Sequence, residues 1–490
     1  MRKCGTLLHI SSLPGNYGIG NFGNDAYAFV DFLKNSGQSL WQILPLGITS
    51  FGDSPYQSQS SFAGNPYFID PEQLYKDGLV TRDMLESQKN NADFVDYGKL
   101  YRERYPFLRK AFSSFDTHSE KYEKFLKENE SWLDNFALFM AIKSLHKNRA
   151  LTDFEYKYKS RDESALKDIE KRYSDEINFW KIGQYYFFKQ WFALKKYANK
   201  SGVEIIGDIP IYVAADSADV WENPGLFLLD DEYNPTLVAG CPPDSMSKQG
   251  QKWGNPIYNW EKMKEDDYLW WKKRFEMNAS LYDYLRIDHF RGFSAYYEIN
   301  AADETAERGQ WKRGVGFDFF KKVKDSIGNT KIIAEDLGFI DDDVKVLLEK
   351  CGYPGMKILE FGFDEKKESV HLPHNYKRNT FAYTGTHDND TFMSYYLSSE
   401  GDTQTFIRSY LDSSLFNDIC FKAVRALFSS VADNVIIPMQ DYLSLPAMAR
   451  MNTPSSIGNN WRWRVHGADF NESLEQKILS IARLYDRTER

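Results

Sequence analysis

The sequence predicts an α/β protein built on a closed (β/α)8 TIM barrel, with insertions around the carboxyl-terminal mouth of the barrel. Eight short apolar runs, rich in β-branched and aromatic residues, recur along the 490 residues between helical or irregular stretches. Several runs follow a polar helical segment and a glycine, which is the order expected of repeated βα units with parallel strands. Eight such units favour a closed barrel over an open doubly wound sheet.

The eight runs are the predicted barrel strands, and we expect residues 1–490 to form a single barrel domain around them. In chain order the runs are Gly5–His9, Leu40–Leu44, Val203–Asp208, Tyr284–Asp288, Lys331–Glu335, Met356–Glu360, Thr380–Thr384 and Asn434–Pro438.

Uneven gaps between the runs predict two insertions. Residues 73–186 are mostly charged and helical, and we interpret them as an inserted helical subdomain. One amphipathic face there contains Trp132 and Phe136, and a capping-box pattern at Ser131 predicts the start of that helix. Residues 221–280 are rich in Pro, Gly and Trp and show little periodicity. We expect this second, loop-rich insertion to shape a binding cleft.

Composition excludes several classes of partner. The chain has 61 Lys and Arg against 70 Asp and Glu, a net charge of −9, which argues against nucleic acid or an anionic membrane. No apolar stretch approaches the roughly 20 residues of a membrane helix. The 4 cysteines lie far apart and, like the 8 histidines, lack metal-ligand spacing. We therefore expect a cytoplasmic protein without a metal or another cofactor.

An arginine and an acid share one face of the fourth predicted strand. Alternation along Tyr284–Asp288 places Arg286 and Asp288 on the same face, near the strand end where barrel active sites lie. A neighbouring guanidinium lowers a carboxylate pKa by roughly 1–3 units, so we expect Asp288 to stay ionised as a nucleophile. A structural Arg–Asp pair without a catalytic role is an equally good interpretation of this motif alone.

Two further acids follow later predicted strands. Glu335 ends the fifth strand beside Asp336, and Asp388 follows the seventh strand in the segment His387–Asn389. On a closed barrel, Asp288, Glu335 and Asp388 can converge at one mouth. Glycoside chemistry needs such a set, because it uses an ionised nucleophile, a protonated acid and charge that stabilises an oxocarbenium-like transition state.

With these motifs, the sequence resembles the α-amylase superfamily. Arg286-x-Asp288, Glu335-Asp336 and His387-Asp388 resemble its signature segments, and Asp208 in Gly207–Tyr212 fits the remaining one. The finer resemblance is to glycoside hydrolase family 77, the family of 4-α-glucanotransferases or amylomaltases. Five segments carry it: Gly52–Gln57, Phe62–Tyr67, Trp221–Gly225, Gly250–Pro256 and Asn460–Arg464.

The resemblance implies a retaining double displacement on α-1,4-glucans, with maltooligosaccharides as both donor and acceptor. Asp288 would be the nucleophile, Glu335 the acid and base, and Asp388 a stabiliser of the distorted transition state. The two carboxyl groups of Asp288 and Glu335 are then expected roughly 5–5.5 Å apart. The resemblance also implies substrate-binding residues around the cleaved bond: Arg286, His387, Asp208 and Tyr56 at the cleavage subsite, and Trp253 on the acceptor side.

Two other functions stay open from the sequence. A hydrolase of the same superfamily would use the same acids with water as the acceptor, and a non-catalytic glucan-binding protein would not need them. The chain also departs from the family pattern in one loop, where Ser245 and Met246 stand in place of two aromatic residues. This departure concerns acceptor binding rather than the three acids.

Overall fold

Eight parallel strands form one sheet that curls into a nearly closed barrel in this computed structural model, which describes residues 2–243, 247–365, 368–414 and 418–488. The two edge strands of the sheet approach each other. At this point the Ala334 N–H of one edge strand donates to the carbonyl of Pro354, the residue before the other edge strand, at 2.9 Å. The predicted (β/α)8 fold is confirmed. In spatial order the strands are β10 (Gly355–Ile358), β11 (Thr380–Tyr383), β12 (Asn434–Pro438), β1 (Lys3–Leu7), β2 (Leu40–Gln42), β3 (Glu204–Ile209), β6 (Tyr284–Ile287) and β9 (Lys331–Ala334).

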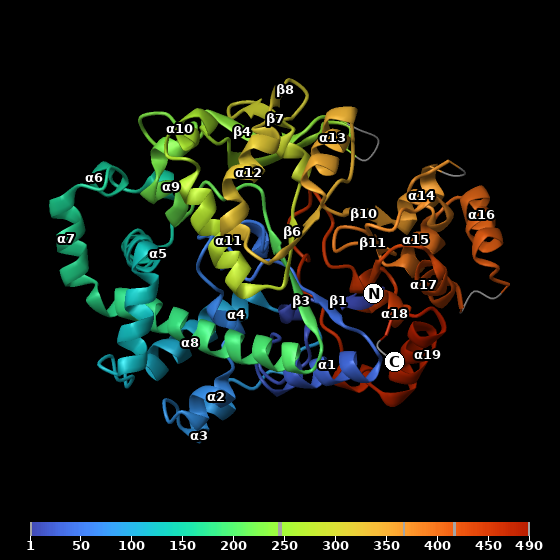
Figure 1. Cartoon of the computed structure of the whole chain (residues 1–490). Coiled ribbons are helices and arrows are strands. Elements are labelled where there is room, and N and C mark those ends of the chain that lie inside the picture. The colour runs from blue at the N-terminus through green and yellow to red at the C-terminus, as the bar shows by residue number, and fades with distance from the viewer. Residues whose placement is uncertain (1, 244–246, 366–367, 415–417, 489–490) are drawn as a thin grey trace.

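Helices surround this barrel (Figure 1). The first of them, α1 (Asn24–Asn35), buries Ala26, Phe29, Val30 and Leu33, which lie one helical turn apart and face the sheet. Further helices of the chain are α8 (Ser174–Lys200), α11 (Leu269–Leu281), α12 (Gly316–Ile327), α13 (Asp342–Cys351), α14 (Leu359–Glu365), α15 (Phe392–Ser398), α16 (Gly401–Leu411), α17 (Ile419–Ser429), α18 (Met439–Tyr442) and α19 (Glu472–Leu484).

Helices fill most of the chain between β2 and β3, and they extend to one side of the barrel (Figure 1). The apolar face that contains Trp132 and Phe136 is buried, as expected. The helix start predicted at Ser131 was wrong, because the Glu- and Lys-rich residues before it are good helix formers and extend the helix. These helices are α2 (Pro71–Lys76), α3 (Arg82–Ser87), α4 (Tyr97–Phe112), α5 (Glu120–Leu145), α6 (Tyr156–Lys159) and α7 (Glu163–Arg172).

A second sheet, which the eight predicted strands did not include, lies beside the loop after β6. It is antiparallel and has the order β5, β4, β7, β8. Strand β7, which forms a hairpin with β8, contacts the turn Phe290–Phe293 that directly follows β6. The elements between β3 and β9 that belong to this region are α9 (Ala218–Glu222), β4 (Leu237–Cys241), β5 (Gln251–Pro256), α10 (Trp260–Glu265), β7 (Ala295–Asn300) and β8 (Gln310–Arg313).

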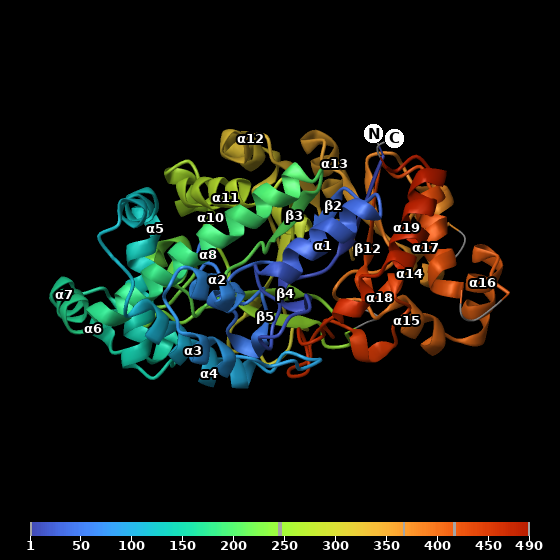
Figure 2. The same cartoon turned by 90° about the horizontal axis from the view of Figure 1, so that it is seen from below.

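The two ends of the described chain lie side by side on the barrel (Figure 2). Arg2 Nη1 donates to the Tyr485 carbonyl at 3.0 Å, so the first strand and the last helix hold each other in place. Within the described ranges, no helix is long and apolar enough to cross a membrane.

Candidate active site

Strand register places two acids side by side at the mouth of the barrel. Ile287 of β6 pairs with Ala334 of β9, and Asp288 and Glu335 are the next residue of each strand. Glu335 N–H donates to the Ile287 carbonyl at 3.1 Å, so the register continues past the ladder. The two carboxyl groups therefore start from adjacent backbone positions at the carboxyl ends of parallel strands.

Arg286 connects these acids to a third one. Its partner across the strand pair β3–β6 is Asp208, and Arg286 Nη1 lies 2.6 Å from Asp208 Oδ2. The same Nη1 is 3.1 Å from Asp288 Oδ1, and Nη2 is 3.5 Å from Glu335 Oε2. The Arg286 side chain is only 3% exposed, so these ion pairs are shielded from solvent. One guanidinium thus contacts three carboxylates.

Burial determines how readily Asp288 and Glu335 hold protons. It raises the pKa of Asp288 well above its ordinary value; Arg286 lowers that pKa, and Glu335 and Asp208 raise it again. Burial also raises the pKa of Glu335, against the effects of Arg286 and the His289 N–H. Arg286 therefore lowers the pKa of Asp288 as expected, but the net shift of that pKa is upward. The cause is desolvation, which outweighs the neighbouring positive charge.

The residue after Asp288 turns the chain toward Glu335. His289 adopts a left-handed conformation with φ of 49°, which is uncommon for a residue with a side chain. In this conformation its backbone N–H donates to Glu335 Oε2, and Phe290 N–H donates to the Glu335 carbonyl at 3.2 Å. The loop after β6 thereby fixes both the backbone and the carboxyl group of Glu335.

Asp388 lies on the loop after β11 and is held by residues far along the chain. Asn452 Nδ2 donates to Asp388 Oδ1 at 2.7 Å, and Arg450 Nη2 donates to the Asp388 carbonyl at 2.7 Å. His387 Nε2 is 3.4 Å from Asp388 Oδ2. Burial lowers the pKa of His387, which favours the neutral imidazole, although Asp388 opposes this effect.

A chain of buried hydrogen bonds supports the same loop from behind. Glu360 Oε2 accepts from Asn389 Nδ2 at 2.9 Å, and Asn389 Oδ1 accepts from both the backbone and hydroxyl groups of Thr386. Thr386 Oγ1 in turn accepts the Asp388 N–H at 3.3 Å. These contacts hold the backbone turn that carries His387 and Asp388.

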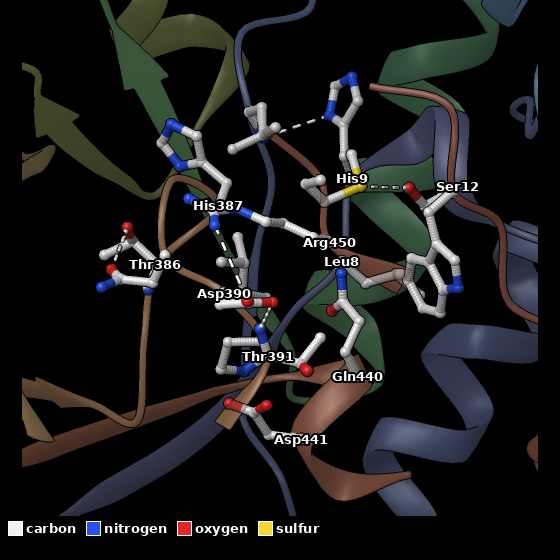
Figure 3. A pocket seen from close by; sticks show the side chains of 16 residues that line it. Leu8, His9, Ser12, Thr386, His387, Asp390, Thr391, Gln440, Asp441 and Arg450 are labelled. Atoms are coloured by element: carbon white, nitrogen blue, oxygen red, sulfur yellow. Dashed lines mark hydrogen bonds and ion pairs between the residues drawn. The ribbon is translucent and has the colours of Figure 1, made fainter. Parts of the chain in front are cut away.

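A small pocket lies behind this loop, at the ends of β1, β11 and β12 (Figure 3). His387, Asp390 and Arg450 line one part of it, and His9 lines another. Arg450 Nη1 lies 3.9 Å from Asp390 Oδ2, so this arginine joins the β11 loop to the segment after α18. Residues that hold the Asp388 loop in place, such as Arg450, line this pocket, whereas the Asp388 carboxyl group does not.

Two aromatic side chains complete the predicted set. Tyr56 OH donates to Asp208 Oδ2 at 2.9 Å, and the Tyr56 ring stacks on His387 with a centroid distance of 5.1 Å. The Trp253 ring packs edge-on against the His289 ring with a centroid distance of 4.9 Å, and the His289 N–H donates to Glu335 Oε2. All eight predicted site residues are therefore joined, directly or through His289, in one cluster at the barrel mouth.

Sequence reasoning missed the residues that support this cluster. Asn389 directly follows the His387-Asp388 motif, so its position was a usable signal. Arg450 and Asn452 are 62 and 64 residues from Asp388, and no motif links them to it. The two substituted loop positions, Ser245 and Met246, lie outside the described residues.

The arrangement favours proton transfer and nucleophilic chemistry. Two buried carboxyl groups that contact one guanidinium can hold one proton and one negative charge between them. In the part of the chain that the structure describes, no group of three or more His, Cys, Asp or Glu side chains is arranged to hold a metal ion.

Comparison with known proteins places this geometry in a family. The sequence profile described as 4-alpha-glucanotransferase, of glycoside hydrolase family 77, matches residues 8–470. The chain is 46% identical to the 4-alpha-glucanotransferase of Streptococcus pneumoniae over 99% of its own length and 97% of that protein. It is 43% identical to the 4-alpha-glucanotransferase of Clostridium butyricum, over 98% and 100% of the two lengths.

A solved structure agrees with this result over the whole fold. The amylomaltase from Streptococcus agalactiae, determined in complex with acarbose, superimposes with a TM-score of 0.97 at 44% identity and covers 100% of both chains. Sequence, fold and the four matched acidic motifs therefore lead to one assignment. This chain belongs to glycoside hydrolase family 77, the 4-alpha-glucanotransferase family.

Proposed function

We propose that this chain is a 4-α-glucanotransferase that moves α-1,4-glucan segments between maltooligosaccharides by a retaining double displacement. The observation that carries the proposal is the single guanidinium of Arg286 in contact with Asp208, Asp288 and Glu335. It holds two acids from adjacent strand ends together in a buried site, as a nucleophile and a proton donor must be held.

In the first step, a carboxylate oxygen of Asp288 attacks the anomeric carbon, and the bond from that carbon to the bridging oxygen breaks. Glu335 gives its proton to the departing oxygen, which leaves as the 4-hydroxyl group of the released glucan. Arg286 is closer to Asp288 than to Glu335, at 3.1 Å against 3.5 Å, which favours the negative charge on Asp288. Burial raises the pKa of both carboxyl groups, so the pair retains a proton, and the shorter Arg286 contact to Asp288 favours Glu335 as the group that carries it.

In the second step, the 4-hydroxyl group of an acceptor glucan attacks the anomeric carbon of the covalent intermediate. Glu335, now a carboxylate, takes the proton of that hydroxyl group, and the bond to Asp288 breaks. The configuration at the anomeric carbon is inverted twice and is therefore retained.

The other site residues bind the sugar that reacts. Asp388 would accept hydrogen bonds from neighbouring ring hydroxyl groups and stabilise the distorted ring, with its carboxyl group oriented by Asn452. His387 and Tyr56 stack on each other and form a wall of the same subsite, which Asp208 fixes through the Tyr56 hydroxyl group. Trp253, beside His289, would contact the acceptor.

Hydrolysis of α-1,4-glucans is the alternative that uses the same acids. The similarity to the 4-alpha-glucanotransferase of Streptococcus pneumoniae over 99% of the chain favours transfer. Transfer requires that an acceptor hydroxyl group reaches the intermediate before water does.

Incubation with maltotriose tests the proposal. The transferase produces glucose and a ladder of longer oligosaccharides at an almost constant number of reducing ends, whereas a hydrolase increases that number steadily. Asp288→Asn should abolish the ladder, while isothermal titration with maltotriose still detects binding. A ladder that persists in Asp288→Asn would overturn the assignment of the nucleophile, and a steady rise in reducing ends would overturn transfer itself.

A further inference from the structure

Arg291, two residues after His289, contacts two aromatic rings near the barrel mouth. Its guanidinium carbon lies 3.8 Å from the centre of the Trp311 ring and 5.8 Å from that of Phe339. Arg291 Nη2 also lies 3.2 Å from Asp341 Oδ2. Three separate segments contribute to this cluster: the turn after β6, strand β8 and the loop after β9.

In this cluster the charged side chain is buried and the aromatic side chains are exposed, which is the opposite of what folding stability alone favours. The Arg291 side chain is 4% exposed, and its buried Nε has no hydrogen-bond partner. Phe339, by contrast, is 70% exposed, which is more than any other aromatic side chain in the described ranges, and Trp311 is 38% exposed. A buried cation thus supports two aromatic faces that remain open to solvent, an arrangement suited to contact with a ligand.

The cluster lies next to the backbone that holds Glu335. Phe339 is four residues after Glu335, and Arg291 directly follows Phe290, whose N–H donates to the Glu335 carbonyl. Because the acid gives its proton to the departing sugar and later takes one from the acceptor, its own loop borders the acceptor side.

We infer that Trp311 and Phe339, held by Arg291, form an outer acceptor subsite that stacks on a glucose unit of the acceptor α-1,4-glucan beyond the unit at Trp253. This inference rests on the proposed glucan transfer. Glucose rings present flat apolar faces, and an aromatic ring already fixed by a buried arginine loses little freedom when a sugar stacks on it. A glucose acceptor is too short to use this subsite, whereas maltotriose extends into it.

The test separates donor from acceptor by using α-maltotriosyl fluoride as the donor. Fluoride carries no sugar into the acceptor subsites, and its release counts only turnovers of this donor, so the initial rate of fluoride release at increasing glucose or maltotriose reports the acceptor side. In Trp311→Ala and Phe339→Ala, the ratio of kcat/KM for maltotriose to that for glucose should fall about two- to tenfold. Trp311→Phe should restore most of the ratio. Tyr156→Ala is the matched control, because Tyr156 is 58% exposed on α6, far from the β7–β8 hairpin (Figure 1).

Three outcomes would overturn the inference: an unaltered ratio in both alanine variants, an equal loss with both acceptors, or the same fall in Tyr156→Ala. Circular dichroism of each variant checks that it is folded, and both aromatic side chains are exposed enough for truncation to be tolerated. If the unsubstituted protein transfers no glucan to either acceptor, the proposed function fails instead, so the two failures are distinguishable.

Discussion

Asn452→Ala tests whether the orientation of Asp388 matters for the reaction. The substitution removes the 2.7 Å hydrogen bond from Asn452 Nδ2 to Asp388 Oδ1 but keeps the backbone hydrogen bond from Asn452 N–H to the His387 carbonyl, at 3.1 Å. A hydrogen bond to a charged group contributes about 1.5–3 kcal/mol. If that energy orients the carboxylate in the transition state, kcat/KM should fall about 10- to 150-fold.

The assay is the initial rate of glucose release from maltotriose, with kcat and KM determined separately. We expect most of the loss in kcat, because Asp388 is proposed to bind the distorted ring more strongly than the relaxed one. Asn460→Ala is the matched control, because the Asn460 side chain forms its hydrogen bonds with Thr453 and Ser456 in the same segment rather than with an acid of the site. A loss below twofold in Asn452→Ala, or an equal loss in Asn460→Ala, would refute the reasoning.

Two further predictions concern charge and packing. Asp208→Asn removes a negative charge that raises the pKa values of both Asp288 and Glu335. Both limbs of the pH profile of kcat/KM should therefore move to lower pH, and a shift to higher pH would contradict the proposed electrostatics. Trp41 is fully buried in β2, packs against Phe29 and donates its Nε1–H to the Leu8 carbonyl. Trp41→Ala should therefore lower the free energy of unfolding, measured by urea titration, by about 3–5 kcal/mol. A loss below about 1 kcal/mol would contradict the packing argument.

The barrel was predictable because its strands are buried on both sides and therefore form continuous apolar runs. Even the weakest run, Met356–Glu360, corresponds to β10, displaced by one residue at its start and two at its end. The second sheet was not predictable in the same way. Its strand β8 is exposed along its whole length, and β5 is half exposed with two glycine or proline positions. Such strands are held by pairing with neighbours rather than by apolar burial, so their sequence carries little signal.

The acids of the site were predictable for a related reason, since each follows a strand that the sequence marks clearly. Parallel strands of a closed barrel end at one mouth, which makes Asp288 and Glu335 neighbours once their strands pair. The supports of Asp388 followed no such rule. Arg450 and Asn452 reach the site from an irregular segment after α18, and only the tertiary fold brings that segment to the loop after β11. The net pKa of Asp288 was also beyond the sequence, because the extent of burial is a property of the whole fold.

The geometry around Arg286 explains why burial and catalysis are linked in this site. One positive charge faces three carboxylates, and the closest contact, 2.6 Å, is to Asp208 rather than to either proposed catalytic acid. Asp208 Oδ2 also accepts the Tyr56 hydroxyl group, so two donors converge on this one oxygen. Asp288 and Glu335 are left with longer contacts to the guanidinium and with each other's repulsion. A buried pair under those conditions is stabilised by holding a proton. The pair therefore keeps the proton that the first step consumes, because too little positive charge is nearby to ionise both carboxyl groups. A second cation at this position would ionise the acid, and the proton would be lost.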